Sequence, residues 1–95
     1  MIESDRIDLG DDHSMTFSEY NGEQKVAATV YHRKPDGAEC AGFIAFEGRA
    51  WANAFTTPIT TWKVEQDEPL TLSPSILCRV CGDHGCIRNG RWVRA

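Results

Sequence analysis

Three of the four cysteines in this chain of 95 residues lie close together near its C-terminus, with one of its three histidines. The stretch reads Cys78-x2-Cys81-Gly82, and His84 and Cys86 follow at once. A two-residue gap lets both thiolates face one ion, and the glycine allows the tight turn that such a loop needs. In a strand that starts here, residues 84 and 86 point to the same side. The pattern therefore predicts a metal site made by Cys78, Cys81, His84 and Cys86.

The sequence leaves undecided which residue is the fourth ligand. Four ligands within so short a stretch form a tight set, because most small zinc sites take their second pair from a distant segment. Cys40 is the obvious outside candidate and the alternative fourth ligand, and His32, on a neighbouring strand candidate, is another. Three thiolates and one imidazole are a known composition of structural zinc sites, and thiolates favour zinc over magnesium, calcium or manganese. Because four protein ligands leave no position for water or substrate, we expect a structural zinc ion and no enzyme.

Three other interpretations of the cysteines compete with this one. A redox Cys-x-x-Cys normally lies at the start of a helix in an α/β fold, and the sequence predicts neither. Buried apolar thiols are common, and Cys40 in its apolar segment suits that description better than Cys78 and Cys81, which lie among Arg, Gly and Asp. HNH nucleases also combine an Asp-His pair with zinc knuckles, as Asp83-His84 does here. A second catalytic histidine at a suitable position is missing, so a metal-dependent nuclease or hydrolase is the weakest hypothesis.

The chain ends in a predicted hairpin that is rich in arginine. Its loop is Asn89-Gly90, the preferred sequence for a type I′ turn. Arginine contacts phosphate and aromatic rings stack on bases, so the hairpin predicts a small nucleic-acid or nucleoprotein surface. The predicted contact residues are Arg88, Arg91, Trp92 and Arg94. The alternative is that Trp92 belongs to the core and that the arginines are solvated or pair with acidic residues.

The charge of the chain is divided unevenly. Residues 76–95 sum to +3 and residues 1–75 to −7, which together give the net charge of −4. The basic tail predicts either an acidic partner or a tail that folds back on the acidic body. A second function class is contact with a protein, through the acidic body or through Trp51 and Trp62. This hypothesis includes self-association and leaves a homo-oligomer open.

Short alternating segments separated by turn signals are expected to position these residues. Strands are predicted around 15–20, 25–32, 40–46, 59–66, 70–77 and 86–93, with turns at "NGEQ" (21–24) and "KPDG" (34–37). Residues 49–56 fit either a strand or one helical turn. We predict an all-β, mostly antiparallel, small single domain over residues 13–95, with a zinc-knuckle or zinc-ribbon-like C-terminal hairpin. Residues 1–12 are expected to form a flexible N-terminal segment.

The expected cellular compartment is inferred from signal-peptide and membrane-spanning patterns. It shows no signal peptide, and its apolar runs, such as "FIAF" (43–46), are far too short to span a bilayer. We therefore expect a cytoplasmic protein without a membrane partner. In a reducing cytosol, four cysteines indicate metal binding or free thiols rather than disulfides.

Beyond residue 12, most of the chain resembles a family of small uncharacterised proteins from phages and prophages of actinobacteria. The resemblance rests on "PLTLSPSILCRVCGDHGCIRNGRWV" (69–93), "YHRKPDGAECAGFIAFEGRAW" (31–51) and "TWKVEQ" (61–66). A wider set of phage proteins is similar only at "TLSPS" and a His-x-aromatic-x-Arg-x-Gly hairpin, which His84, Arg88 and Gly90 match. Cys86 falls where that set has an aromatic residue, which favours Cys40. The resemblance implies a phage origin, with a virion, accessory or host-inhibiting protein among the roles, and brings no activity.

Overall fold

The computed structural model describes residues 2–95 and contains ten strands and one short helix in these residues. The elements are β1 (Ile2–Glu3), β2 (Ile7–Gly10), β3 (His13–Tyr20), β4 (Glu23–Arg33), β5 (Glu39–Ala45), α1 (Ala50–Asn53), β6 (Lys63–Gln66), β7 (Thr71–Ser73), β8 (Ile76–Leu77), β9 (His84–Arg88) and β10 (Arg91–Arg94). The predicted all-β, antiparallel fold in a small single domain is confirmed, and the ambiguous segment forms the one helical turn.

The main sheet has the order β1-β3-β4-β5, and β2 also pairs with β3. The tight turn between β3 and β4 is made by Asn21 and Gly22, which both have positive φ. The predicted KPDG turn joins β4 to β5, where the Gly37 N–H donates to the Lys34 carbonyl at 2.9 Å. These two turns set the register of the sheet, and the second places His32 directly opposite Cys40.

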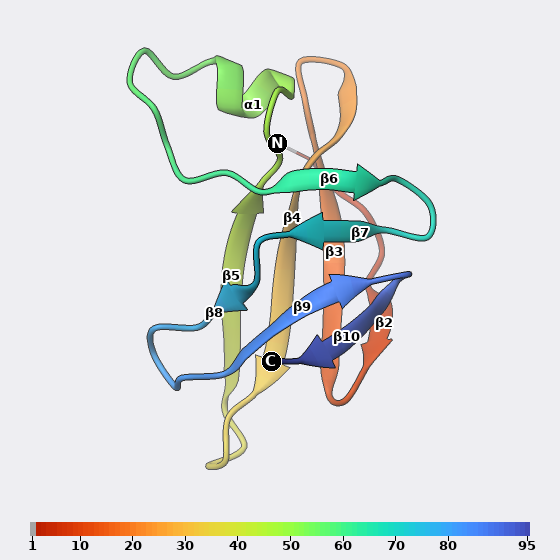
Figure 1. Ribbon diagram of the computed structural model, residues 1–95, viewed down its shortest axis with the longest axis vertical. Coiled ribbons are helices and arrows are strands. Elements are labelled where there is room, and N and C mark those ends of the chain that lie inside the picture. Colours follow the sequence, from red (N-terminus) through yellow and green to blue (C-terminus); the bar gives the residue numbers. More distant parts are fainter. Residues whose placement is uncertain (1) are drawn as a thin grey trace.

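A second layer covers one face of the main sheet. It consists of the two-stranded β6-β7 sheet and the three-stranded β10-β9-β8 sheet, which cross in front of β3 and β4 (Figure 1). The predicted C-terminal hairpin is β9-β10, and Asn89 and Gly90 at its loop have φ of 48° and 73°. Figure 1 also shows that α1 and the β4-β5 turn lie at opposite ends of the molecule.

The hydrophobic core lies between the two layers. Alternate residues of the main sheet, such as Met15, Val30 and Ile44, point toward Ile87 and Trp92 of the second layer. Even-numbered residues of β4 and β5 therefore face inward, as the period of two of a strand requires. His32 and Cys40 share this parity, so both side chains lie on the inner face, at the end of the sheet away from α1.

The segment that was expected to be flexible contributes strands. Residues 2–12 include β1 and β2, which pair with opposite ends of β3. Leu9 of β2 is 1% exposed and belongs to the core. Met1, which is part of the same expectation, lies outside the described residues. Among the helices of the described part, none is long and apolar enough to cross a membrane.

Candidate metal centre

Four possible metal ligands from three separate segments meet at one end of the sandwich. They are His32 of β4, Cys40 of β5, and Cys78 and Cys81 of the loop between β8 and β9; their ligand atoms all lie within 4.8 Å of one another. In a tetrahedral zinc site with ordinary bond lengths, neighbouring ligand atoms lie about 3.4–3.8 Å apart. The cluster therefore has the size and the donor types of a site that could hold a metal ion.

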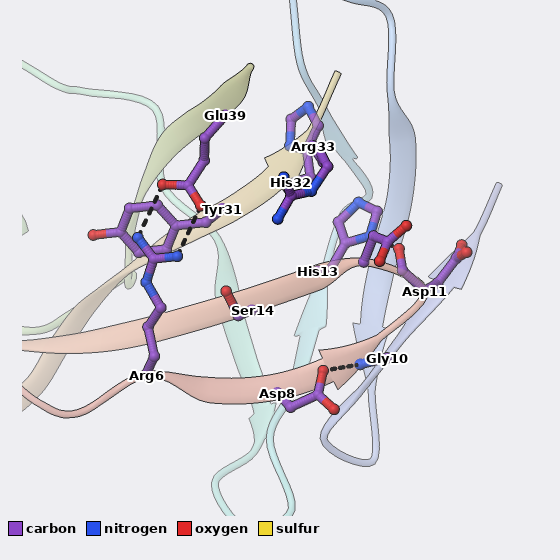
Figure 2. A pocket seen from close by; sticks show the side chains of 11 residues that line it. Arg6, Asp8, Gly10, Asp11, His13, Ser14, Tyr31, His32, Arg33 and Glu39 are labelled. Carbon is purple, nitrogen blue, oxygen red and sulfur yellow. Dashed lines mark hydrogen bonds and ion pairs between the residues drawn. The ribbon is translucent and has the colours of Figure 1, made fainter. Parts of the chain in front are cut away.

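The β4-β5 hairpin positions the first two ligands. His32 and Cys40 face each other across the antiparallel pair, and both are buried, with 7% and 6% of their surface exposed. Glu39, next to Cys40, is held by two hydrogen bonds from the Arg6 guanidinium at 2.8 and 3.0 Å (Figure 2). This exposed ion pair joins the start of β5, next to Cys40, to the segment before β2.

A tight loop positions the other two ligands. The Gly82 N–H donates to the Cys78 carbonyl, and the Cys78 N–H donates to the Asp83 carbonyl, both at 2.8 Å. Gly82 has a φ of +80°, the conformation that the sequence assigned to this glycine. The loop turns Cys81 toward the main sheet, where its Sγ lies 3.0 Å from Nε2 of His32.

The thiols of the cluster differ in acidity. Burial disfavours the thiolate of Cys78, but the backbone N–H groups of Cys81 and Val80 outweigh it and lower the pKa of Cys78. Burial raises the pKa of Cys40 to about 11, and the neighbouring thiols of Cys78 and Cys81 add to that effect. The thiol of Cys78 therefore ionises more readily than that of Cys40, which needs a strong counter-charge such as a metal ion to become a thiolate.

Asp83 links the cluster to a second histidine. Its Oδ2 lies 2.7 Å from Nε2 of His13 and 4.0 Å from Nδ1 of His32. The His13 ring in turn contacts the Asp11 carbonyl through Nδ1 at 2.5 Å and stacks on the Trp92 ring, with centroids 4.1 Å apart. The usual outer support of a metal-binding imidazole is a carboxylate hydrogen-bonded to its second nitrogen; at 4.0 Å from His32, Asp83 can support that ring only through its negative charge.

His13, His32 and Asp83 also come within 4.8 Å of one another as a potential ligand group of their own. The rings of His13 and His32 stack with an interplanar angle of 22° and centroids 5.3 Å apart; Figure 2 shows them side by side. A metal ion lies in the plane of an imidazole that binds it, and two nearly parallel planes offer no shared position close by. We therefore assign this group to the support of the first cluster.

The structure places the remaining predicted ligands elsewhere. His84 is exposed, and its Nε2 lies 2.8 Å from Oγ of Ser75; Cys86 accepts a hydrogen bond from Nε of Arg88 at 3.3 Å. In β9 the alternate residues Gly85 and Ile87 face the core. Residues 84 and 86 thus share one side of the strand, as expected, but that side is the outer one. Of the predicted set, Cys78 and Cys81 come together with the alternative Cys40 and with His32.

The arginine hairpin is divided between surface and core. Arg88 and Arg91 are exposed, whereas Trp92 is only 7% exposed and packs on His13. Arg94 forms a two-pronged ion pair with Asp11, at 2.5 and 3.1 Å. Stacking of Trp92 on a base would need this ring to leave the core, and one of the three arginines already has an acidic partner.

Comparison with family models, with curated proteins and with solved structures found no match to this chain. The function must therefore be inferred from the site and the surface.

Proposed function

We propose that the chain is a small non-catalytic binding domain completed by a structural zinc ion. The observation that carries this proposal is the convergence of His32, Cys40, Cys78 and Cys81 from three segments within 4.8 Å. Three thiolates and one imidazole select zinc among the common biological cations. With four protein ligands, the ion has no free position for a substrate, which is why the proposed role is structural.

The ion would tie the C-terminal loop to the main sheet. The loop contributes little to the core, because Val80 is 76% exposed and Leu77 is 54% exposed. Zinc binding to the folded state adds directly to folding free energy, which is valuable to a domain of this size. The zinc-ribbon-like description stays a prediction: β9-β10 follows the cysteine loop, but the other two ligands come from the β4-β5 hairpin.

Native mass spectrometry of the untagged protein tests the zinc site. We expect one zinc per chain in the wild type, lost on acid denaturation, and lost in Cys40→Ser and Cys78→Ser. Cys86→Ser and His84→Ala are matched controls, because these residues lie outside the cluster. Loss of zinc in a control variant, with zinc retained in Cys40→Ser, would instead favour the ligand set read from sequence spacing.

We propose a protein as the partner class. The surface carries exposed apolar side chains at Phe43, Phe55, Leu77 and Val80, with exposed fractions between 42% and 76%. Trp51 of α1 makes edge-to-face contacts with Tyr20, Phe43 and Phe55, which gathers aromatic surface around the helix. Exposed apolar groups of this kind mark protein-interaction sites. The phage origin implied by the resemblance fits a virion, accessory or host-inhibiting protein of this type.

Nucleic-acid binding is the second candidate. It is favoured by Arg88 and Arg91, which stay exposed on either side of the β9-β10 loop. It predicts salt-sensitive binding whose salt dependence weakens in Arg88→Ala/Arg91→Ala. A fluorescent single-stranded oligonucleotide titrated at several salt concentrations measures this, and unchanged binding in the double variant would contradict it.

A cytoplasmic location is part of the proposal. All four cysteines are free thiols, and none of them forms a disulfide. Thiolate ligands stay available for zinc in a reducing compartment.

A further inference from the structure

The outer edge of β5 is a free edge of the main sheet. The Phe46 N–H donates to the Val26 carbonyl at 3.1 Å, and this pair continues the β4-β5 register. Hydrogen-bonded pairs alternate along an antiparallel ladder, so residues 44, 42 and 40 bond to β4. Ala41 and Phe43 therefore direct their backbone N–H and C=O groups away from β4. In the described part of the chain, no hydrogen bond from a loop or a side chain reaches the backbone of either residue.

The free stretch of this edge has a defined length. The Trp62 N–H donates to the Ala45 carbonyl at 2.8 Å, which closes the edge above Phe43. The open part runs from Glu39 to Phe43, so it can pair with an extended segment of about five residues.

An apolar groove lies beside the open edge. It has a volume of about 180 Å³, and its apolar lining includes Trp62, Ile76, Leu77 and Val80. A strand added to β5 would direct alternate side chains into this groove, between the two layers. Its other side chains would face Phe43, which is 42% exposed and contacts Trp51 on the outer face of the sheet. Both faces of the added strand would therefore meet apolar side chains.

The two edges of the main sheet differ in protection. On the side of β2, the ladder with β3 is irregular between Asp8 and Gly10, and Asp8 places an exposed charge on the strand. Irregular pairing and charge are how natural sheets block pairing at an edge. On β5, the outward residues Ala41 and Phe43 are uncharged and flank Gly42, with no proline or bulge in the β4-β5 ladder. Glu39 is the one charged residue of the open stretch, and its carboxylate is paired with Arg6; from Ala41 to Phe43 the β5 edge lacks these protective features.

The positive charge of Arg79 at the groove would favour apolar segments that also carry an acidic residue. Arg79 lines the groove and is exposed, and no described carboxylate forms an ion pair with it. The acidic residue of the lining, Asp83, is already engaged by His13. The rim of the groove therefore carries an unpaired positive charge, which complements an acidic residue in the occupant.

We propose that the β5 edge binds an extended apolar segment of a partner protein, with an acidic residue next to its apolar residues, by addition of a strand to the main sheet. This inference deepens the proposed function, because it rests on a domain that binds a protein. Main-chain hydrogen bonds to Ala41 and Phe43 supply affinity, and the groove and Arg79 supply selectivity.

The probe for the test is a synthetic acetylated peptide, DVTVIVD, with KVTVIVK as its charge-reversed counterpart. Zinc-loaded, ¹⁵N-labelled protein is titrated with each peptide, and amide hydrogen exchange is followed. We expect micromolar binding of the acidic peptide, slower exchange of the Ala41 and Phe43 amides, and at least about 10-fold weaker binding of the basic peptide.

Three variants complete the test. Ala41→Pro removes a donor that points away from β4, so the fold and the zinc content should persist while binding is lost. Arg79→Glu should reverse the preference between the two peptides. Val93→Lys is the matched control, because Val93 is 42% exposed, as Phe43 is, but lies on β10. This variant should bind the peptides as the wild type does.

Three results would overturn the inference. They are no binding of the acidic peptide to zinc-loaded wild type, binding that Ala41→Pro leaves intact, and a wild-type dimer that Ala41→Pro dissolves. The last result would assign the edge to a second copy of this chain. Zinc content is measured on the same samples, so absence of zinc would count against the proposed metal centre, and absence of peptide binding in zinc-loaded protein only against the edge.

Discussion

The two ends of the β4-β5 ladder are held together by different chemistry. At the end near α1, Trp51 forms edge-to-face contacts with three other aromatic rings, with centroids 5.1 to 5.8 Å apart. At the other end, the loop from Cys78 to Asp83 has no fully buried side chain. Its position depends on the cysteine-histidine cluster and on the contact of Asp83 with His13. We call these the aromatic end and the metal end.

This difference indicates which parts of the molecule respond to which perturbation. Aromatic pairs persist in any buffer that keeps the protein folded, whereas a metal-held loop depends on the free concentration of the ion. The free β5 edge runs between the two ends, with Phe43 nearer the aromatic end and Cys40 at the metal end. A binding surface along this edge would therefore be sensitive to metal at one end and insensitive at the other.

Removal of the zinc ion that we propose is expected to have the largest effect. A chelator should lower the free energy of unfolding by roughly 3–8 kcal/mol, less than the about 10–16 kcal/mol known for zinc fingers, because this domain has its own core. At about 4–8 °C per kcal/mol, the melting temperature should fall by at least about 12 °C. Calorimetry with and without a chelator measures this.

Hydrogen exchange then sharpens the comparison between the ends. Amides of residues 78–83 should lose protection on chelation, while those of β4 around Ala27 and Ala28 should keep theirs. Added zinc should restore the first set. Equal loss at both ends would show that the two regions unfold as one unit, which would break the comparison.

Packing should also support the metal end, through Trp92. A Cβ added at Gly85 would lie 2.6 Å from the Trp92 ring and 2.6 Å from the Val93 carbonyl oxygen. Gly85→Ala should therefore destabilise the protein by about 1–3 kcal/mol, through displacement of the ring that stacks on His13. Gly42→Ala is the control, because a Cβ there meets no atom within 4 Å. Urea unfolding of both variants compares them, and equal midpoints would contradict the expectation.

The outer support of the cluster should matter next. Asp83→Asn keeps the shape of the side chain and the backbone contact to Cys78, but it removes the charge near Nδ1 of His32. We expect zinc affinity to fall by up to about 10-fold, at the low end of the range known for hydrogen-bonded partners of a metal-bound histidine, because Asp83 acts on His32 only through its charge. Asp12→Asn is the control, on a neighbouring exposed acid. Competition with a chromophoric chelator gives both affinities, and wild-type affinity in Asp83→Asn would leave Asp83 without this role.

The strands and turns of the fold could be predicted because their conformation depends mainly on residues that are close together in the sequence. Alternation of apolar residues assigned the strands, and Asn-Gly or Pro-Asp-Gly sequences assigned the turns, since backbone conformation there depends on the residues themselves. The helical turn at α1 stayed ambiguous because Trp51 and Phe55 fit two periodicities. The strands at residues 2–10 were missed because their pairing with β3 supplies what their own short sequences do not.

The candidate metal centre was predictable in part. The spacing of Cys78 and Cys81 and the glycine after them indicated a loop that presents two thiolates. The KPDG turn contained the rest of the signal, because a tight turn at 34–37 puts His32 opposite Cys40. Alternation along a strand places His84 and Cys86 on the same side of β9. It does not tell which side faces the core; burial of Ile87, which is 0% exposed, leaves His84 and Cys86 on the outer side. The contact of Asp83 with His13 joins residues 70 positions apart, which no local pattern indicates.

The smallest effect is expected from the ion pair between Arg94 and Asp11, which ties the C-terminal strand to the turn before β3. The Arg94 guanidinium, which hydrogen-bonds to the Asp11 carboxylate, lowers the pKa of that carboxyl group below its ordinary value. A lowered pKa in the folded state means that the ion pair stabilises the protein above about pH 4 and that this contribution is lost as the pH falls through the folded value.

Arg94→Ala should therefore lower the melting temperature slightly at pH 7, and the difference from wild type should shrink on acidification. The difference should also shrink in high salt, because both partners are exposed to solvent. Arg91→Ala, whose guanidinium lies over Gly10 without a carboxylate partner among the described side chains, should show no such pH dependence. Thermal melts of the three proteins between pH 7 and pH 3 decide the matter; a difference that stays the same down to low pH would mean that Arg94 stabilises the metal end by packing rather than by charge.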